Sequence, residues 1–182
     1  MPWIIAGGVA VLLILAVVVI YNGLVRLRNR VDNSYGQVEV QLKRRYDLIP
    51  NLVETVKGYA SHEKDTFEQV TLARSNAQAA SGPAEQAGAE NFLTAALRQL
   101  FAVAEAYPEL RASENFQALQ GELAETENKI AVSRQIYNDT VLTYNNKVQQ
   151  IPTNLVAAMT GFKVREFFEG GPEAQDAPSV SF

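Results

Sequence analysis

A continuous apolar run near the N-terminus, from Trp3 to Tyr21, is the feature that most constrains this chain. The run contains no charged side chain and no strongly polar one. A helix of about 20 residues rises about 30 Å, which matches the hydrocarbon core of a bilayer. The run therefore predicts a membrane-spanning helix. The alternative is a helix buried at the centre of a globular domain.

We expect this run to remain as an anchor rather than to be removed as a signal peptide. A cleaved signal peptide has a positively charged start, an apolar core of roughly 7–15 residues and a small-residue cleavage site. Only two residues precede the run, and residues 22–24 after it make a poor cleavage site. Residues 1–21 are accordingly predicted to form an uncleaved, single-pass anchor.

The residues flanking the run predict its orientation. Arg26, Arg28 and Arg30 follow it closely, whereas only the α-amino group provides positive charge before it. Positive charge favours the cytoplasmic side, so the N-terminus is expected outside and the rest of the chain inside. Trp3 and Tyr21 stand at the two ends, where aromatic side chains favour the membrane–water interface. These five residues are the predicted interface with the bilayer, and the arginines suit anionic headgroups.

The composition excludes several classes of function. Of the 182 residues none is cysteine, which excludes a disulfide scaffold, a thiolate metal site, a cysteine nucleophile and an iron–sulfur cluster. The formal net charge of −4 gives no sign of a nucleic-acid partner. Few glycines and prolines lie outside the termini and one central stretch, which is typical of a helical protein.

Apolar residues at alternating steps of three and four predict four amphipathic helices after the anchor. The first continues the anchor to about residue 48, because Gly23 alone does not interrupt it. Pro50 is expected to end that helix and begin the second, because proline disfavours a helical conformation at the residue before it. The others are expected at about 50–80, 90–107 and 114–151, with a loop over 81–89.

These segments predict an all-α fold: an N-terminal transmembrane helix that continues into an antiparallel up-down-up-down bundle of long, coiled-coil-like helices. The bundle is expected to occupy residues 22–168. An extended coiled-coil hairpin that dimerises is the alternative.

The C-terminal part is expected to turn back at the bundle end. A short amphipathic helix should follow Pro152 and stop at Gly161. The aromatic pair Phe167 and Phe168 then either caps the hydrophobic end of the bundle or contacts the membrane surface. Residues 169–182 are acidic and rich in glycine and proline, which predicts a disordered tail.

A basic cluster, Lys43, Arg44 and Arg45, lies near the expected end of the first helix. It has two interpretations. Cations favour a solvated helix C-terminus, and a cluster of them also suits a patch that docks a protein partner.

No catalytic, cofactor-binding or metal-binding residues are predicted. A di-iron bundle needs Glu-x-x-His pairs, but His62 is the only histidine and Tyr59 stands three residues before it. Carboxylate pairs such as Glu122 and Glu125 are ordinary charges on a helix surface. Phosphate-binding loops and nucleophile motifs are not recognisable.

Three stretches of the chain resemble the LemA family. They are YNGLVRLRNRVDNSYGQVEVQLKRRYDLIPNLVETVKGYASHE at 21–63, YPELRASENFQALQGELAETENKIAVSRQIYNDTVLTYN at 107–145, and NNKVQQIPTNLVAAMTGF followed by REFF. The resemblance covers residues 21–168. It implies a bacterial inner-membrane protein with one N-terminal transmembrane helix, a short outside N-terminus and an antiparallel helical bundle. It implies no reaction and no catalytic residues.

Two functions from different classes follow. The first is a non-enzymatic membrane-anchored scaffold or adaptor that docks protein partners, or a further copy of itself, on its helical faces. The second is a lipid- or small-ligand-binding bundle near the membrane, or a hydrolase that works through carboxylates. A packed core would favour the first function, and an open pocket with converging polar groups would favour the second.

Overall fold

The computed structural model describes residues 1–168, and within them every regular element is a helix. The helices are α1 (Pro2–Lys57), α2 (Lys64–Ala79), α3 (Pro83–Glu105), α4 (Pro108–Arg111), α5 (Glu114–Gln149) and α6 (Thr153–Thr160). The expected all-α fold is confirmed. The tail predicted to be disordered, residues 169–182, lies outside the described residues.

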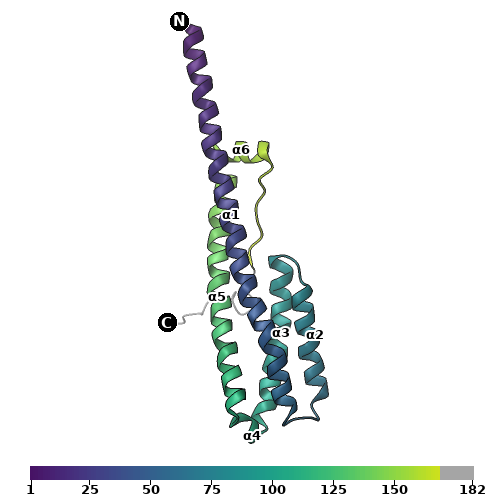
Figure 1. Cartoon of the computed structure of the whole chain (residues 1–182). Coiled ribbons are helices and arrows are strands. Elements are labelled where there is room, and N and C mark those ends of the chain that lie inside the picture. The colour runs from purple at the N-terminus through teal and green to yellow at the C-terminus, as the bar shows by residue number, and fades with distance from the viewer. Residues whose placement is uncertain (169–182) are drawn as a thin grey trace, which may run out of the picture.

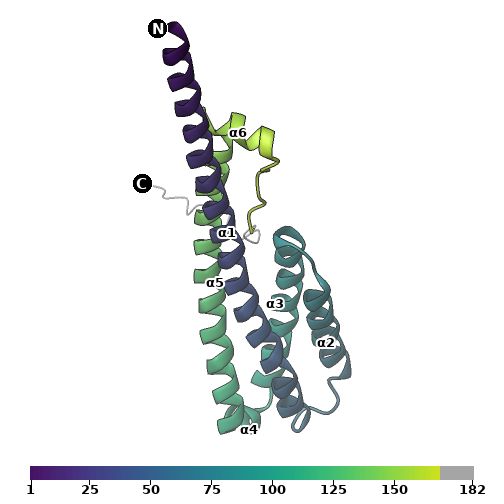
Figure 2. The ribbon, with the colours of Figure 1, turned by 45° about the horizontal axis from the view of Figure 1, so that its top comes forward.

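The long helices α1 and α5 run antiparallel, side by side, and form a stalk (Figures 1 and 2). The α2–α3 hairpin lies beside the half of the stalk that is distant from the N-terminus (Figures 1 and 2). The buried aliphatic residues of α1 recur at steps of three, four and seven except for the adjacent pair at 52 and 53, which largely follows the predicted pattern: Leu24, Val31, Val38, Leu42, Ile49, Leu52, Val53 and Val56. One apolar core therefore runs from the stalk into the distal four-helix region.

The apolar run and the first helix of the bundle are one element. α1 has 56 residues and extends roughly 80 Å without a break. It contains a segment long and apolar enough to cross a membrane, and none of that segment is buried in the fold. A buried central helix is therefore not the role of this run.

The predicted break at Pro50 is wrong, because α1 continues to Lys57. Proline has no N–H to donate to the carbonyl four residues earlier, which here belongs to Tyr46. Arg74 on α2 supplies the missing donor, with its Nε 2.7 Å from the Tyr46 carbonyl oxygen. The chain turns instead over residues 58–63, so the predicted second helix is divided between the end of α1 and α2.

The predicted loop over residues 81–89 is also mostly helical, because α3 begins at Pro83. Gly82 adopts φ 83°, a left-handed conformation that suits glycine. Proline at the first helical position has no intrahelical partner to lose, so it begins α3 rather than preventing it.

In the C-terminal half, α5 begins and α6 stops at the residues that the sequence predicted. α5 begins directly after Ser113, and α6 ends at Gly161, whose φ of 77° forms a left-handed C-cap. Residues 162–168 then extend back along the stalk, and we call this segment the strap (Figure 1).

Candidate functional site

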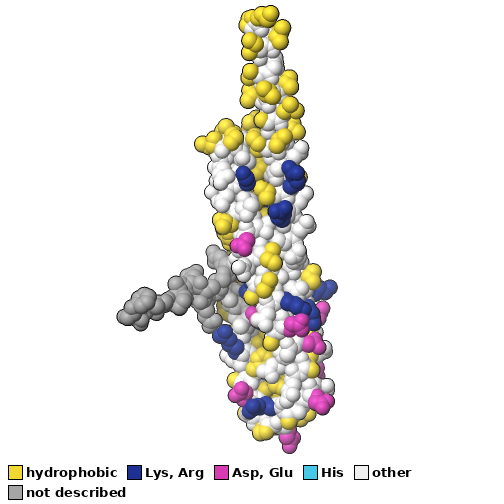
Figure 3. All heavy atoms as spheres, turned by 90° about the vertical axis from the view of Figure 1, so that its left-hand side faces the viewer, with side chains coloured by type: hydrophobic (Ala, Val, Ile, Leu, Met, Phe, Trp, Pro, Cys, Tyr) yellow, Lys and Arg dark blue, Asp and Glu magenta, His cyan; other side chains and the backbone are white. Residues whose placement is uncertain are grey.

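The residues predicted to meet the bilayer lie together at one end of the molecule. Trp3 and Tyr21 are exposed at the two ends of the apolar run. Arg26, Arg28 and Arg30 are exposed beyond it. Figure 3 shows the run as a hydrophobic column with basic side chains gathered beneath it. The contact of these residues with a membrane stays a prediction.

Phe168, one of the residues predicted to contact the membrane, is buried inside the fold. Its side chain is 1 % exposed, and the guanidinium of Arg134 lies 4.4 Å from its ring centroid. Phe167 is exposed, but it belongs to the same strap, which runs away from the apolar run. Phe168 is thus part of the bundle core, because the strap is hydrogen-bonded along α5.

Phe162 is the aromatic residue that lies next to the apolar run. Its ring centroid is 5.7 Å from that of Tyr21, and the Arg28 guanidinium lies 5.4 Å from it. Phe162 directly follows the Gly161 C-cap, and a hydrophobic contact often accompanies such a cap. The sequence therefore contained a signal for the packing of Phe162.

Two asparagines of α5 hold the backbone of the strap. Asn145 donates to the carbonyl of Arg165 at 2.9 Å and accepts from its N–H at 2.8 Å. Asn138 makes the same pair of hydrogen bonds with Phe168, at 3.0 and 2.8 Å. Each side-chain amide therefore pairs with one strap residue as a neighbouring β-strand would.

Two tyrosines of α5, each directly before one of these asparagines, also hydrogen-bond to the backbone of the strap. Tyr144 donates to the carbonyl of Lys163 at 2.9 Å, and Tyr137 donates to the carbonyl of Glu166 at 2.8 Å. Seven helical residues rise about 10.5 Å, and three extended residues cover about 10 Å. The heptad step of the Tyr-Asn pairs thus matches a three-residue step of the strap. The repeated dipeptide YN at 137 and 144 was a signal in the sequence that was missed.

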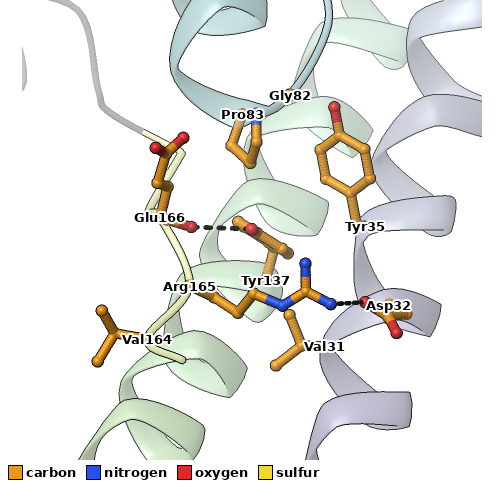
Figure 4. Close-up of a pocket in the computed structure, with 9 residues that line it drawn as sticks. All are labelled: Val31, Asp32, Tyr35, Gly82, Pro83, Tyr137, Val164, Arg165 and Glu166. Atoms are coloured by element: carbon orange, nitrogen blue, oxygen red, sulfur yellow. Dashed lines mark hydrogen bonds and ion pairs between the residues drawn. The ribbon is translucent and has the colours of Figure 1, made fainter. Parts of the chain in front are cut away.

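A polar cavity of about 380 Å³ lies where the strap, α1, α5 and the start of α3 meet (Figure 4). Its lining consists of Val31, Asp32, Tyr35, Gly82, Pro83, Tyr137, Val164, Arg165 and Glu166. Arg165 reaches across from the strap to Asp32, with Nη2 2.7 Å from Oδ1, while Tyr35 points toward Gly82 and Pro83.

The tyrosines of this cavity keep their protons at neutral pH. Burial raises the pKa of the Tyr35 phenol, and it raises the pKa of Tyr137 to about 12. Both phenols are therefore protonated at neutral pH and act as hydrogen-bond donors. In the described part of the chain, no group of three or more His, Asp or Glu side chains is arranged to hold a metal ion.

The predicted basic patch is divided by the fold. Lys43 and Arg44 are exposed, but Arg45 is 4 % exposed and is no part of a surface patch. Its guanidinium Nη1 lies 3.0 Å from Glu90 on α3 and 2.9 Å from Glu127 on α5. Nη2 donates to Thr94 at 2.9 Å. These ion partners lie on α3 and α5, so the residues next to Arg45 in the sequence do not indicate that it is buried.

Tyr46 extends this buried cluster toward α2. Its hydroxyl donates to Glu90, and Gln86 donates to the same hydroxyl at 2.7 Å. Burial is the main cause that raises the pKa of Tyr46, and the neighbouring Glu90 carboxylate adds to it. The cluster therefore ties α3 to the stalk through hydrogen bonds and ion pairs within the fold, which indicates a structural role.

Arg44 instead belongs to a face of the stalk that the α2–α3 hairpin leaves open. Val40 is 64 % exposed there and lines a depression of about 330 Å³ with Ser133 of α5. Lys129 pairs with Glu125, and the nearby Arg44 also lowers the pKa of that carboxyl. We call this surface, formed by Val40, Arg44 and Ser133 with their neighbours Gly36 and Gln37, the open face.

Comparison with known proteins finds relatives that are similar in sequence over most of the chain. The chain is 28 % identical over 187 residues to magnetosome protein MamQ 2 of Paramagnetospirillum magneticum, covering 88 % of this chain and 68 % of that protein. It is 26 % identical over 187 residues to magnetosome protein MamQ of Magnetospirillum gryphiswaldense, with the same coverage. It is 26 % identical over 140 residues to protein LemA of Metamycoplasma hominis, covering 75 % of this chain and 63 % of that protein.

A family model described as LemA family matches residues 34–182, which include the distal stalk, the α2–α3 hairpin and the Tyr-Asn repeat of α5. The resemblance noted in the sequence is therefore confirmed over most of the chain, and the protein belongs to the LemA family.

Proposed function

We propose that this protein is a non-enzymatic scaffold, anchored in the bacterial inner membrane by a single span of α1, that docks protein partners on its cytoplasmic bundle. The observation that carries the proposal is the continuity of α1, which joins the exposed apolar run to the bundle core in one helix. A surface on the bundle is thereby held at a fixed height above the bilayer. Such fixed geometry suits a scaffold that presents a docking surface to partners near the membrane.

The open face is the surface that we assign to partner docking. Val40, which is 64 % exposed, is the large apolar side chain of this face. Arg44 and Lys43 border it with positive charge. Gly36 has free space in place of a side chain, which allows a partner backbone to approach closely. The pattern of an apolar centre with a charged rim is typical of protein interfaces.

The proposal is tested by affinity purification of the full chain from native membranes. The same proteins should be recovered with the wild-type chain and with Leu72→Asp, which changes an exposed residue of α2. Val40→Asp should reduce their recovery severalfold, because it places a charge at the centre of the interface. Equal recovery with all three chains would contradict docking on the open face.

The orientation is tested separately by protease added to spheroplasts, in which the outer face of the inner membrane is accessible and the inner membrane is intact. The bundle should stay uncut, because the positive charge of the arginines after the run favours the cytoplasmic side of the membrane. Digestion of the bundle under these conditions would contradict the orientation.

A small-ligand-binding function is the second candidate, and the polar cavity at the strap is the observation that favours it. Its donors, Tyr35 and Arg165, suit an anionic or strongly polar molecule. Soluble phosphorylated metabolites, tested as a panel in a thermal-shift assay, should stabilise the wild-type chain but not Tyr35→Phe if this function applies. An unchanged melting temperature throughout would remove it.

A further inference from the structure

We propose that α6, together with the preceding Ile151, is a second membrane contact that lies on the headgroup surface of the bilayer crossed by α1. This inference rests on the proposed membrane span of α1. It assigns to α6 the membrane contact that the sequence had suggested for the aromatic tail.

The exposed side of α6 is apolar. Ile151, Leu155 and Met159 recur at steps of four and are 83, 62 and 85 % exposed. The opposite side, with Val156 and Ala157, is buried in the bundle. Leu155 and Met159 lie four residues apart within α6 and so share one face of the helix as an uncovered apolar stripe. Ile151 precedes the helix and adds a third exposed apolar side chain. A stripe of large apolar side chains on an otherwise polar surface marks a contact site.

The position of α6 identifies the bilayer as the partner. Thr153, at the start of α6, lines the same small depression as Ile20 and Gly23, where the apolar run of α1 ends. At the other end of α6, Phe162 lies against Tyr21. Figures 1 and 2 both show α6 lying across the direction of α1 at this level. The stripe is therefore at the depth where α1 leaves the hydrocarbon core.

The distribution of charged residues around α6 also fits a position at the membrane surface. Residues 148–162 contain no charged side chain, and Lys147 and Lys163 bound this stretch on either side. Lysine side chains at such ends extend their ammonium groups to the headgroups while their stems stay in apolar surroundings. Figure 3 shows hydrophobic side chains continuing from the column of the run onto a shoulder at the height of α6. The apolar surface of the span and that of α6 thus form one continuous surface, which a bilayer covers without a further partner.

The test uses the absence of cysteine from the chain, which allows single labelling sites. Met159→Cys, Leu12→Cys and Val132→Cys each receive a fluorophore in the full-length chain, reconstituted in phosphatidylcholine vesicles that carry a lipid-attached nitroxide quencher. Leu12 reports the proposed span, and Val132 is an exposed stalk residue of α5 distant from α6. All three positions are exposed, so the substitutions leave the core intact.

We expect lipid quenching at Met159→Cys to exceed that at Val132→Cys by roughly threefold, with quenching at Leu12→Cys as a positive control. Quenching at residue 12 with residue 159 equal to residue 132 would overturn the α6 contact and leave the span intact. No quenching at residues 12 and 159 would contradict the span and therefore both proposals. A label at residue 159 that is protected from aqueous iodide as well as from the lipid quencher would indicate that a second copy of the chain covers α6, and it would also overturn the inference.

Discussion

Arg74 donates a hydrogen bond from Nε to the carbonyl oxygen of Tyr46, the backbone acceptor that Pro50 leaves without its helical donor. A side chain on α2 therefore completes the hydrogen-bonding ladder of α1. This contact lets one helix extend from the apolar run to the distal end of the bundle, and it fixes α2 against the stalk.

Replacing Arg74 should therefore cost stability through the orphaned carbonyl. We expect Arg74→Ala to lower the free energy of unfolding by about 1–3 kcal/mol, measured by urea denaturation in detergent micelles. In a Pro50→Ala background the restored N–H serves the Tyr46 carbonyl, so the same change should cost clearly less. An equal loss in both backgrounds would show that Arg74 acts in another way.

The buried charge of Arg45 should be costly to remove. Arg45→Met leaves the carboxylate of Glu90, which is 1 % exposed, without its cation, and we expect a loss of about 3–5 kcal/mol in the free energy of unfolding. Arg44→Met, the neighbouring exposed arginine, should change stability by less than about 0.5 kcal/mol. Similar values for the two variants would contradict the structural role of the buried cluster.

The strap should open when its asparagine partners are removed. Asn145→Ala deletes both hydrogen bonds to Arg165, which should raise trypsin cleavage after Lys163 and Arg165 by about tenfold. Asn146→Ala, the exposed neighbour, serves as the control and should be cleaved at the wild-type rate. The rates are read from a time course of the fragments, and identical rates for the two variants would argue against the Tyr-Asn ladder.

The raised pKa of Tyr137 predicts a loss of stability at alkaline pH. In the unfolded chain its phenol loses a proton near pH 10, whereas in the fold it keeps the proton to about pH 12. The folded state thus binds more protons between these values, so its stability falls as pH rises. Tyr137→Phe is expected to be less stable at pH 8, because its hydrogen bond to Glu166 is lost.

The difference between this variant and the wild-type chain should shrink by up to about 2 kcal/mol between pH 10 and pH 12. Urea denaturation at three pH values measures it. A constant difference across this range would show that Tyr137 titrates as it does in the unfolded chain.

The sequence predicted what depends on local periodicity. The apolar run, the heptad seams of α1 and α5 and the Gly161 stop of α6 each follow from residues within the element itself. Pro50 was misread because its consequence is decided by Arg74, which is 24 residues away along the chain but adjacent in space. Arg45 was misread as surface for the same reason, since its carboxylate partners lie on α3 and α5.

The strap escaped prediction for a different physical reason. Its backbone is held by the side chains of another helix, and no periodicity within residues 162–168 reports that contact. The matching signal lies in α5, where Tyr-Asn recurs after seven residues. The polar cavity depends on this strap and was equally invisible from local pattern.

The central claim is that a protein partner docks on the open face while α1 holds the bundle at the membrane. A photo-crosslinking amino acid placed at Val40 in the full-length chain, activated in native membranes, tests this most directly, with the same amino acid at exposed Phe92 of α3 as the comparison. The account predicts a reproducible crosslinked protein from position 40 that is absent from position 92. No crosslink at position 40, or the same products from both positions, would contradict it.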